Sequence, residues 1–247
     1  MMASRMIRYV LEQETDVAAV VAAPVQGVEY IPPAGFWATV RQACDEHGAL
    51  LIFDEVQTGL GKTGRMFACE HYGVTPDMLV LGKSLGGAVV PLAAVIVRER
   101  FDVLGDMAIG HYTHEKNPLL AVAGLTTLAI IRDEGLVEKA ADLGRQGLAL
   151  AQDLAERHPL IGEVRGIGLQ MGIELVRDRV SKEPARDAAE AVLYAALDRG
   201  LSLKISNGCI LALSPPLIIT PEELANAIAI IDECLTLVDQ GGGGPIG

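Results

Sequence analysis

The sequence predicts an α/β protein, in which a large domain with a mainly parallel sheet precedes a small α+β domain. In the first half of the chain, short apolar runs alternate with helical patterns and glycine-rich loops, as in a parallel sheet with covered faces. From Pro118 onward, long helical patterns are interleaved with short strands. We expect the large domain over residues 1–130, the small domain over 131–239, and a disordered glycine-rich tail over 240–247.

The expected strands of the large domain are short and apolar throughout. They cover residues 17–23, 49–53, 78–81 and 92–97. Apolar runs of this length, bounded by glycine or proline, are typical of strands that are buried on both faces. We therefore expect these strands to lie inside a covered sheet.

Helices are expected between and after these strands. The first occupies residues 32–48, from a Pro-Pro pair to a glycine, and a short helical piece follows near 66–71. The Asn-Pro pair at 117–118 begins a helix up to about residue 135, whose continuously apolar sequence predicts burial. The remaining expected elements are a helix ending near 158, helices over 185–199 and 221–238, and strands over 161–165, 170–176 and 201–205.

The charge of the chain limits its partners. Its 247 residues include 20 basic and 32 acidic residues, for a net charge of −12. Such a chain repels phosphate backbones and anionic lipid headgroups. No apolar run reaches the roughly 18 residues that would span a bilayer, and the amino terminus lacks the apolar core of a secretory signal. We therefore expect small-molecule partners, with no nucleic acid and no membrane.

The four cysteines, Cys44, Cys69, Cys209 and Cys234, are scattered along the chain. None forms a C-x-x-C pair or stands at metal-ligand spacing from a histidine. Unpaired, mostly structural thiols of this kind predict a reducing compartment, the cytoplasm.

The stretch LLIFDEVQTGLGKTG, residues 50–64, resembles parts of a nucleotide site. Its Gly-Lys-Thr ending is that of a phosphate loop, which requires the pattern G-x-x-x-x-G-K-[ST]. The first glycine of that pattern would fall on Val56. A nucleotide site is therefore disfavoured.

Asp54 and Lys83 each follow an expected buried strand. Sites in parallel sheets lie at the carboxyl ends of the strands. Pyridoxal phosphate chemistry uses this combination, since a carboxylate keeps the pyridine nitrogen protonated and a lysine binds the aldehyde. Each residue also has an ordinary explanation, Asp54 as a turn or helix cap and Lys83 as a solvated loop lysine.

Five segments together resemble the class III aminotransferases. These are FDEVQTGLGKTG, TPDMLVLGKSLGGAVVPLAAV, YTHEKNPL, VRGIGLQMGIEL and LSPPL, in this order. The family is the fold-type I pyridoxal 5'-phosphate group that includes ω-amino acid transaminases and dialkylglycine decarboxylase. The resemblance extends over about residues 17–238 and implies a fold-type I architecture and a homodimer.

The resemblance assigns roles to individual residues. Lys83, in LGKSLGG, is the catalytic lysine that binds the cofactor aldehyde, and Asp54, at the start of DEVQTG, is the partner of the pyridinium nitrogen. Val56 is expected on one face of the cofactor ring and Gln57 near its phenolic oxygen. Thr113 matches the threonine that contacts the cofactor phosphate of the neighbouring subunit, a role that suits a hydroxyl ahead of a helix N-terminus.

Several nearby residues have alternative interpretations. Thr113 could be an ordinary helix cap. Lys62 and Arg65 are interpreted as part of a loop near the mouth of the site. His111 and His114 could form a metal pair, but no carboxylate or thiol joins them, so we expect no metal.

Two positions depart from the family pattern. Many members carry a glutamate and a substrate-binding arginine at the positions of Ala23 and Ala212, and these charges pair when no acid is bound. Losing one alone would leave a partly buried charge unpaired, at a cost of about 3 to 5 kcal/mol. Loss of both predicts a neutral substrate pocket without the usual α-carboxylate clamp.

The start of the chain is a further departure. No segment before residue 17 resembles the phosphate cup or the stacking aromatic residue of the family. The sequence is therefore interpreted as the carboxyl-terminal part of an enzyme with an incomplete large domain. Such a sheet would expose an edge and an apolar face, and would hold the cofactor weakly.

The resemblance implies transfer of an amino group between an amine or amino acid donor and a keto acid or aldehyde acceptor. Lys83 would move the proton and Asp54 would sustain the electron sink. A lyase, decarboxylase or epimerase using the same cofactor is the first alternative. A catalytically silent fragment or interaction subunit is the second.

Overall fold

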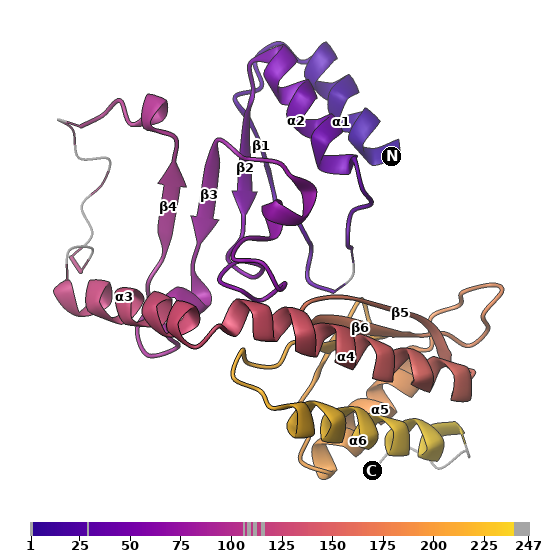
Figure 1. Cartoon of the computed structure of the whole chain (residues 1–247). Coiled ribbons are helices and arrows are strands. Elements are labelled where there is room, and N and C mark those ends of the chain that lie inside the picture. Colours follow the sequence, from indigo (N-terminus) through magenta and orange to yellow (C-terminus); the bar gives the residue numbers. More distant parts are fainter. Residues whose placement is uncertain are drawn as a thin grey trace. The chain divides into compact units, whose positions relative to one another are not determined.

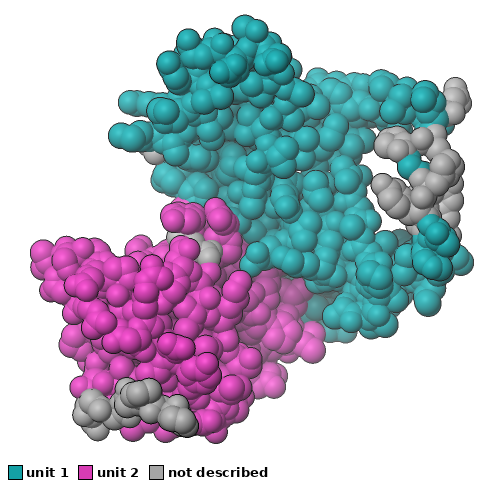
Figure 2. All heavy atoms as spheres, turned by 180° about the vertical axis from the view of Figure 1, so that it is seen from behind, with its two compact units in different colours: residues 1–25, 32–61, 65–137 teal, residues 26–31, 62–64, 138–247 magenta. Residues whose placement is uncertain are grey.

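The computed structural model describes residues 2–28, 30–105, 107, 110, 113–114 and 117–239. The chain divides into two compact units, coloured separately in Figure 2. Unit 1 comprises Met1–Val25, Pro32–Gly61 and Arg65–Val137, and unit 2 comprises Gln26–Ile31, Lys62–Gly64 and Glu138–Gly247. The predicted domain limits at residues 130 and 239 stay a prediction, and the predicted tail over 240–247 lies outside the described residues.

Unit 1 is built on a four-stranded sheet in the order β1-β2-β3-β4. The strands are β1 (Ala19–Ala22), β2 (Leu50–Asp54), β3 (Met78–Leu81) and β4 (Ala94–Val97). The first three run parallel, and β4 runs antiparallel to β3 (Figure 1). The predicted α/β fold with a mainly parallel sheet is thus confirmed.

Burial differs between the centre and the edges of this sheet. In β2, Leu51 and Phe53 are fully buried. In the edge strands, Val21 of β1 is 64% exposed and Val95 of β4 is 58% exposed. The prediction that all these strands are buried on both faces was wrong for β1 and β4, because an apolar run records the type of side chain and not whether another element covers it.

Two helices of unit 1, α1 (Met2–Gln13) and α2 (Phe36–His47), pack against each other. The predicted helix over residues 32–48 corresponds to α2, which ends at Gly48 in the left-handed conformation. On the sheet side, the ring nitrogen of Trp37 donates to the carbonyl of Pro24 at 2.9 Å, and its ring packs edge-on against Phe53. α1 was not predicted.

The described part of unit 1 contains three short 3-10 helices, of which the first two lie between strands and the third follows β4. They are η1 (Ala68–Tyr72), η2 (Lys83–Gly86) and η3 (Glu99–Phe101). The helical piece predicted near residues 66–71 is therefore a 3-10 turn displaced by about two residues, a common uncertainty at helix ends.

The helix α3 (Pro118–Asp133) begins where the Asn-Pro pair predicted it. The side chain of Asn117 caps it by accepting from the backbone N–H of Leu119 at 3.0 Å. Its predicted burial was wrong, since Val122 is 60% exposed and Leu125 is 68% exposed. Gly124 and Ile131 are its buried residues, so only one side of α3 packs within unit 1.

Unit 2 contains an antiparallel sheet in the order β5-β6-β8-β7. Its strands are β5 (Ile161–Ile167), β6 (Gln170–Leu175), β7 (Lys204–Ser206) and β8 (Ile210–Leu213), and its helices are α4 (Leu136–Arg157), α5 (Arg186–Asp198) and α6 (Pro221–Asp239). The strand predicted over residues 201–205 lies later, as β7. The strand β8 was missed because four apolar residues before a Pro-Pro pair are too few for a clear period.

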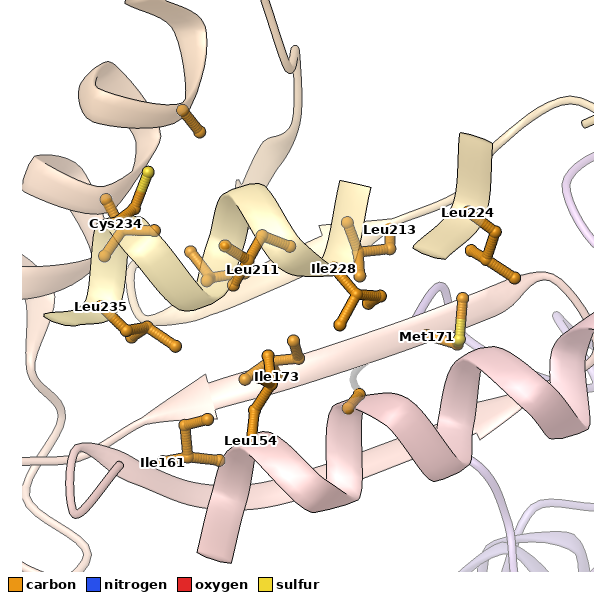
Figure 3. Close-up of a cluster of buried hydrophobic side chains, with 14 of the residues drawn as sticks. Leu154, Ile161, Met171, Ile173, Leu211, Leu213, Leu224, Ile228, Cys234 and Leu235 are labelled. Carbon is orange, nitrogen blue, oxygen red and sulfur yellow. The ribbon is translucent and has the colours of Figure 1, made fainter. Parts of the chain in front are cut away.

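The core of unit 2 lies between this sheet and its helices. Figure 3 shows Ile173 of β6 and Leu211 of β8 directed toward side chains of α4 and α6, among them Leu154 and Ile228. Ile173 and Leu211 have no exposed surface. Burial of each side chain of this size stabilises the fold by about 1.5 to 3 kcal/mol. This cluster therefore holds the sheet and its helices together.

The cysteines and the helix lengths also bear on the sequence-based expectations. The four cysteines are free and buried, as predicted for structural thiols. Among the described residues, no helix is both long and apolar enough to cross a membrane.

Candidate active site

The carboxyl ends of β2 and β3 bring the predicted cofactor residues to one edge of the sheet. In the parallel register Asp54 lies opposite Val80, so adjacent backbones are about 4.8 Å apart there. Lys83 follows three residues later. A Cβ built on Gly82 would lie 3.4 Å from both methyl groups of Val56. The loop after β2 and the loop after β3 are therefore in direct contact.

Asp54 is exposed at the end of β2. Its Oδ1 accepts from the backbone N–H of Val56 at 3.0 Å, which is a turn contact of the kind expected for a strand-end aspartate. No described residue donates to Oδ2. One oxygen thus fixes the carboxylate and the other remains available to a ligand.

Glu55 points the opposite way and is 1% exposed. Its carboxylate accepts from the backbone N–H groups of Ala68 at 2.6 Å and Cys69 at 2.8 Å, and from the hydroxyl of Thr58 at 3.1 Å. It thereby caps η1 and holds the loop after β2. Sequence reasoning missed this residue, although the alternation of side chains along a strand requires one member of an Asp-Glu pair to turn inward.

Lys83 has an unusual backbone conformation. Its φ is +47°, in the left-handed region that residues other than glycine rarely occupy. The residue is exposed, and no described residue pairs with its ammonium group. Strained conformations of this kind are concentrated at functional sites, where they direct a side chain that the regular backbone would not present.

Small residues on α3 and in the loop that carries Lys83 allow the two segments to pack closely. A Cβ on Gly124 would lie 2.6 Å from a methyl carbon of Leu92, and one on Gly87 would lie 2.8 Å from the hydroxyl oxygen of Thr127. These glycines allow α3 to approach the loop closely, and η2 packs on α3. The loop that carries Lys83 is therefore closely packed against α3.

The other predicted site residues occupy different places. Gln57 is exposed in the turn after Asp54, and Ala23 is half-buried directly after β1, which pairs with β2. Thr113 is exposed, and residues 111, 112, 115 and 116 around it lie outside the described residues. Ala212 is half-buried in β8 of unit 2. The structure thus brings Asp54, Val56, Gln57 and Lys83 to one edge.

Lys62 lies in unit 2 and is largely buried. Its ammonium group donates to the carbonyl of Ser214 at 3.2 Å and to the carbonyl of Pro215. Burial lowers the pKa of Lys62 to about 8. The backbone carbonyl of Lys62 accepts from Leu169 at 3.0 Å. The hydrogen bonds of Lys62 therefore connect its loop with the segment that follows β8. Arg65, in contrast, is exposed and belongs to unit 1.

The two histidines considered as a metal pair are only partly described, and the expectation of no metal stays a prediction. His111 lies outside the described residues, and His114 is exposed. Among the residues that the structure describes, no group of three or more His, Cys, Asp or Glu could hold a metal ion.

A model of the class III aminotransferase family matches residues 2–235. The chain belongs to the class III aminotransferases. Among curated relatives, it is 40% identical over 234 residues to (R)-1-hydroxy-2-aminoethylphosphonate ammonia-lyase of Vibrio splendidus (strain 12B01), covering 94% of this chain and 49% of the relative. It is 39% identical over 229 residues to leucine/methionine racemase of Thermococcus litoralis, covering 91% of this chain and 51% of the relative.

Solved structures that resemble the chain include transaminases. The transaminase from the marine bacterium Virgibacillus is 29% identical with a TM-score of 0.92, over 98% of this chain and 58% of that one. An aminotransferase of Bacillus anthracis is 31% identical with a TM-score of 0.89, over 96% of this chain and 56% of that one. The predicted fold-type I resemblance is confirmed.

The chain spans about half the length of the curated relatives that it matches. Class III aminotransferases depend on pyridoxal 5'-phosphate. The edge formed by β2 and β3 fits this cofactor chemically. It presents a carboxylate oxygen of Asp54 and the amine of Lys83, neither of which has a partner among the described residues, at and just after adjacent strand ends.

Proposed function

We propose that the chain carries the lysine and the carboxylate of a pyridoxal phosphate-dependent aminotransferase. The reaction would move an amino group from an amine or amino acid donor to a keto acid or aldehyde acceptor. The observation that supports it most is the register of β2 and β3, which sets Asp54 beside the strand end that leads to Lys83. The family membership supports the same reaction class.

Each residue at this edge has a defined task in the proposal. Bound there, pyridoxal phosphate would supply an electron sink for the substrate carbon. Asp54 Oδ2 would keep a proton on the ring nitrogen. Lys83 Nζ would bind the aldehyde carbon and, once released by a substrate amine, move a proton at the substrate carbon. Val56 would pack on one ring face, and Gln57 would donate to the phenolic oxygen.

The assembly is also part of the proposal. Thr113 would contact the cofactor phosphate of a neighbouring copy, so the active form would be a homodimer. The exposed apolar side of α3, with Val122 and Leu125, supports association of unit 1 with another polypeptide. The predicted cytoplasmic location stays a prediction.

The cofactor test uses the full chain. Pyridoxal phosphate is added, the visible band of lysine-bound cofactor is recorded, and borohydride then fixes the cofactor for peptide mapping. We expect the label on Lys83 and its absence in Lys83→Ala. Lys182, which is exposed in unit 2, provides the matched control variant Lys182→Ala, which should label like the wild type.

A folded chain that gives no band, or a label on another lysine, would contradict the proposal. That result would favour the silent fragment or interaction subunit. Circular dichroism of the same sample establishes that the chain is folded.

A lyase or epimerase is a second candidate that two observations favour. Ala23 and Ala212 supply no charge pair, and the relatives include an ammonia-lyase and a racemase. Proton movement by Lys83 serves all of these reactions, so they differ in the fate of the amino group. Release of ammonia without a keto acid acceptor would indicate the lyase, and inversion of a chiral amino acid without amino transfer would indicate the epimerase.

A further inference from the structure

The loop after β3 is strained at Lys83 and again a few residues later. Lys83 has a φ of +47°, and Ala88 has a φ of +59°. Residues with a Cβ avoid this left-handed region, because the Cβ comes too close to the backbone. Such conformations persist only where the surrounding structure holds them. The contacts that surround this loop therefore determine the conformation of Lys83.

The first of these contacts lies on the sheet side, directly before the lysine. Gly82 is buried. A Cβ built on Gly82 would lie 3.4 Å from both methyl groups of Val56 and 3.9 Å from the Cβ of Ala93. Val56 follows β2 and Ala93 directly precedes β4. The backbone that leads into Lys83 is therefore enclosed between two other segments of the same sheet edge.

The second contact is made by α3. Figure 1 shows α3 beside the carboxyl end of β3, and η2 packs on this helix. A Cβ on Gly87, which ends η2, would lie 2.8 Å from Oγ1 of Thr127. That hydroxyl donates to the carbonyl of Ala123 at 2.9 Å, which fixes its direction. One turn earlier on α3, a Cβ on Gly124 would lie 3.6 Å from the carbonyl oxygen of Leu85.

Hydrogen bonds within the loop connect the two contacts. The N–H of Leu85 donates to the carbonyl of Gly82 at 3.0 Å, and the N–H of Gly87 donates to the carbonyl of Ser84 at 2.9 Å. Lys83 thus lies between a backbone position enclosed by the sheet and a turn that rests on α3. With both ends held, the loop cannot relax at Lys83 unless it moves away from α3.

We propose that Thr127 and Gly124 are positioning residues, through which α3 holds Lys83 in the left-handed conformation. The conformation sets the direction in which the lysine side chain leaves the backbone at the edge formed by β2 and β3. The inference rests on the proposed function in that Lys83 is taken to be the lysine that binds the cofactor aldehyde. Both α3 residues act on it through the backbone of η2.

The first measurement compares glycine with alanine at position 83. Glycine adopts a positive φ without the steric cost that alanine has. Lys83→Gly should therefore unfold at a thermal midpoint about 2 to 4 °C above that of Lys83→Ala. Lys182 has a φ of +58° and lies in unit 2. Lys182→Gly and Lys182→Ala are the matched pair and should differ by a similar amount.

Thr127→Leu then tests the role of α3. The longer side chain meets the backbone of Gly87 and should displace the loop, so the difference between glycine and alanine at position 83 should disappear. The difference at position 182 should remain. Thr126→Leu makes the same change at an exposed position of the same helix and should leave both differences unchanged.

Two further measurements support this comparison. Gly124→Leu places a side chain at a buried position of α3 and should act like Thr127→Leu. The carbon chemical shifts of Lys83 in the ¹³C-labelled wild type report the sign of φ and require no variant. They should indicate a positive φ, and a negative φ would overturn the proposal even if neither α3 variant folds.

The kinetics of cofactor binding distinguish positioning from stability. The rate at which the visible band forms is recorded against pyridoxal phosphate concentration for the wild type, Thr127→Leu and Thr126→Leu. A displaced Lys83 should lower the limiting rate by about tenfold to a hundredfold in Thr127→Leu. The half-saturating concentration should stay unchanged, because Asp54 stays in place. A purely structural effect would reduce the folded fraction and leave the limiting rate per folded chain unchanged.

Equal midpoints for Lys83→Gly and Lys83→Ala, beside a Lys182 pair that differs, would overturn the proposal. It is equally overturned if the difference at position 83 persists in Thr127→Leu and Gly124→Leu, or if Thr127→Leu keeps the wild-type limiting rate. The midpoints do not involve the cofactor. Coupled midpoints in a chain that never labels Lys83 would therefore contradict the proposed function and leave the positioning by α3 supported. Labelling of Lys83 without coupled midpoints would contradict the positioning alone.

Discussion

At the scale of single residues, the two neighbouring carboxylates at the end of β2 have different roles. Glu55 has a structural role, and Asp54 is proposed to bind the cofactor. Glu55 is buried and accepts three hydrogen bonds, whereas Asp54 is exposed and makes one turn contact. A strand turns successive side chains to opposite faces. The residue that sequence reasoning selected for the cofactor is the one that faces out.

This division predicts opposite effects for two matched substitutions. Glu55→Gln replaces an acceptor with a donor beside buried N–H groups, and should lower the free energy of unfolding by about 2 to 3 kcal/mol. Asp54→Asn should change it by less than about 0.5 kcal/mol but weaken pyridoxal phosphate binding. Urea unfolding and the visible cofactor band measure the two effects, and equal destabilisation by both variants would refute the division.

Lys62 predicts a pH dependence of stability. Its pKa is lowered by burial from 10.5 to about 8, so burial outweighs the two carbonyl acceptors. Between these values the unfolded chain binds more protons than the folded chain, and the free energy of unfolding therefore rises with pH. The contribution should be roughly 1 to 3 kcal/mol and should be complete above pH 10.5.

The measurement compares the wild type with Lys62→Met across this range. Buried thiols such as Cys69, whose pKa burial raises to about 12, change stability in the opposite direction but equally in both proteins. The difference between the two unfolding curves therefore isolates Lys62. A difference that stays constant with pH would show that Lys62 keeps its ordinary pKa when folded.

At the scale of elements, close backbone approach decides how α4 packs in unit 2. A Cβ on Gly144 would lie 2.3 Å from the carbonyl oxygen of Gly168. Gly168 lies between β5 and β6, and a Cβ on it would lie 2.3 Å from the backbone of Thr63. Three chain segments thus meet without side chains between them, and the Lys62 loop is held between the turn and α4.

Gly144→Ala should therefore be strongly destabilising despite the better helix propensity of alanine. The new methyl group meets backbone atoms that cannot rotate away, so we expect a loss of more than about 2 kcal/mol. Gln146→Ala, at an exposed position of the same helix, is the control and should change stability by less than about 0.5 kcal/mol. Thermal or urea unfolding distinguishes them, and similar values would rule out the close contact.

At the scale of the whole molecule, unit 1 leaves apolar surface uncovered. On α3, Leu119, Val122 and Leu125 are each at least 60% exposed, and on β4 Val95 and Ile96 are at least 50% exposed. Exposed apolar patches and free sheet edges favour contact with other polypeptides.

We therefore predict concentration-dependent self-association of the isolated chain. Leu125→Glu places a charge on the exposed side of α3 and should shift the equilibrium toward the monomer without loss of stability. Tyr194→Glu, at an exposed position of α5 in unit 2, is the control and should associate like the wild type. Sedimentation over a wide range of concentrations measures both, and a wild-type chain that stays monomeric throughout would contradict the prediction.

The sequence predicted most of the local structure because local chemistry determines it. The run over Met78–Leu81 matches β3, and Asn117 caps α3 where the Asn-Pro pair indicated. Burial was less predictable. The apolar sequences of β4 and α3 predicted covered elements, yet most of β4 and one side of α3 are exposed, since burial depends on what lies opposite and not on the element itself.

The same distinction holds for the candidate site. From the sequence, Asp54 and Lys83 were each expected to follow a buried strand, and the charges of the family were seen to be missing at Ala23 and Ala212. The folded structure was needed to show that Glu55 turns inward, that Lys62 donates to the carbonyl of Ser214, and that β2 and β3 are neighbours in the sheet. Strand ends follow from local patterns, whereas register and burial arise from pairing between segments far apart in the chain.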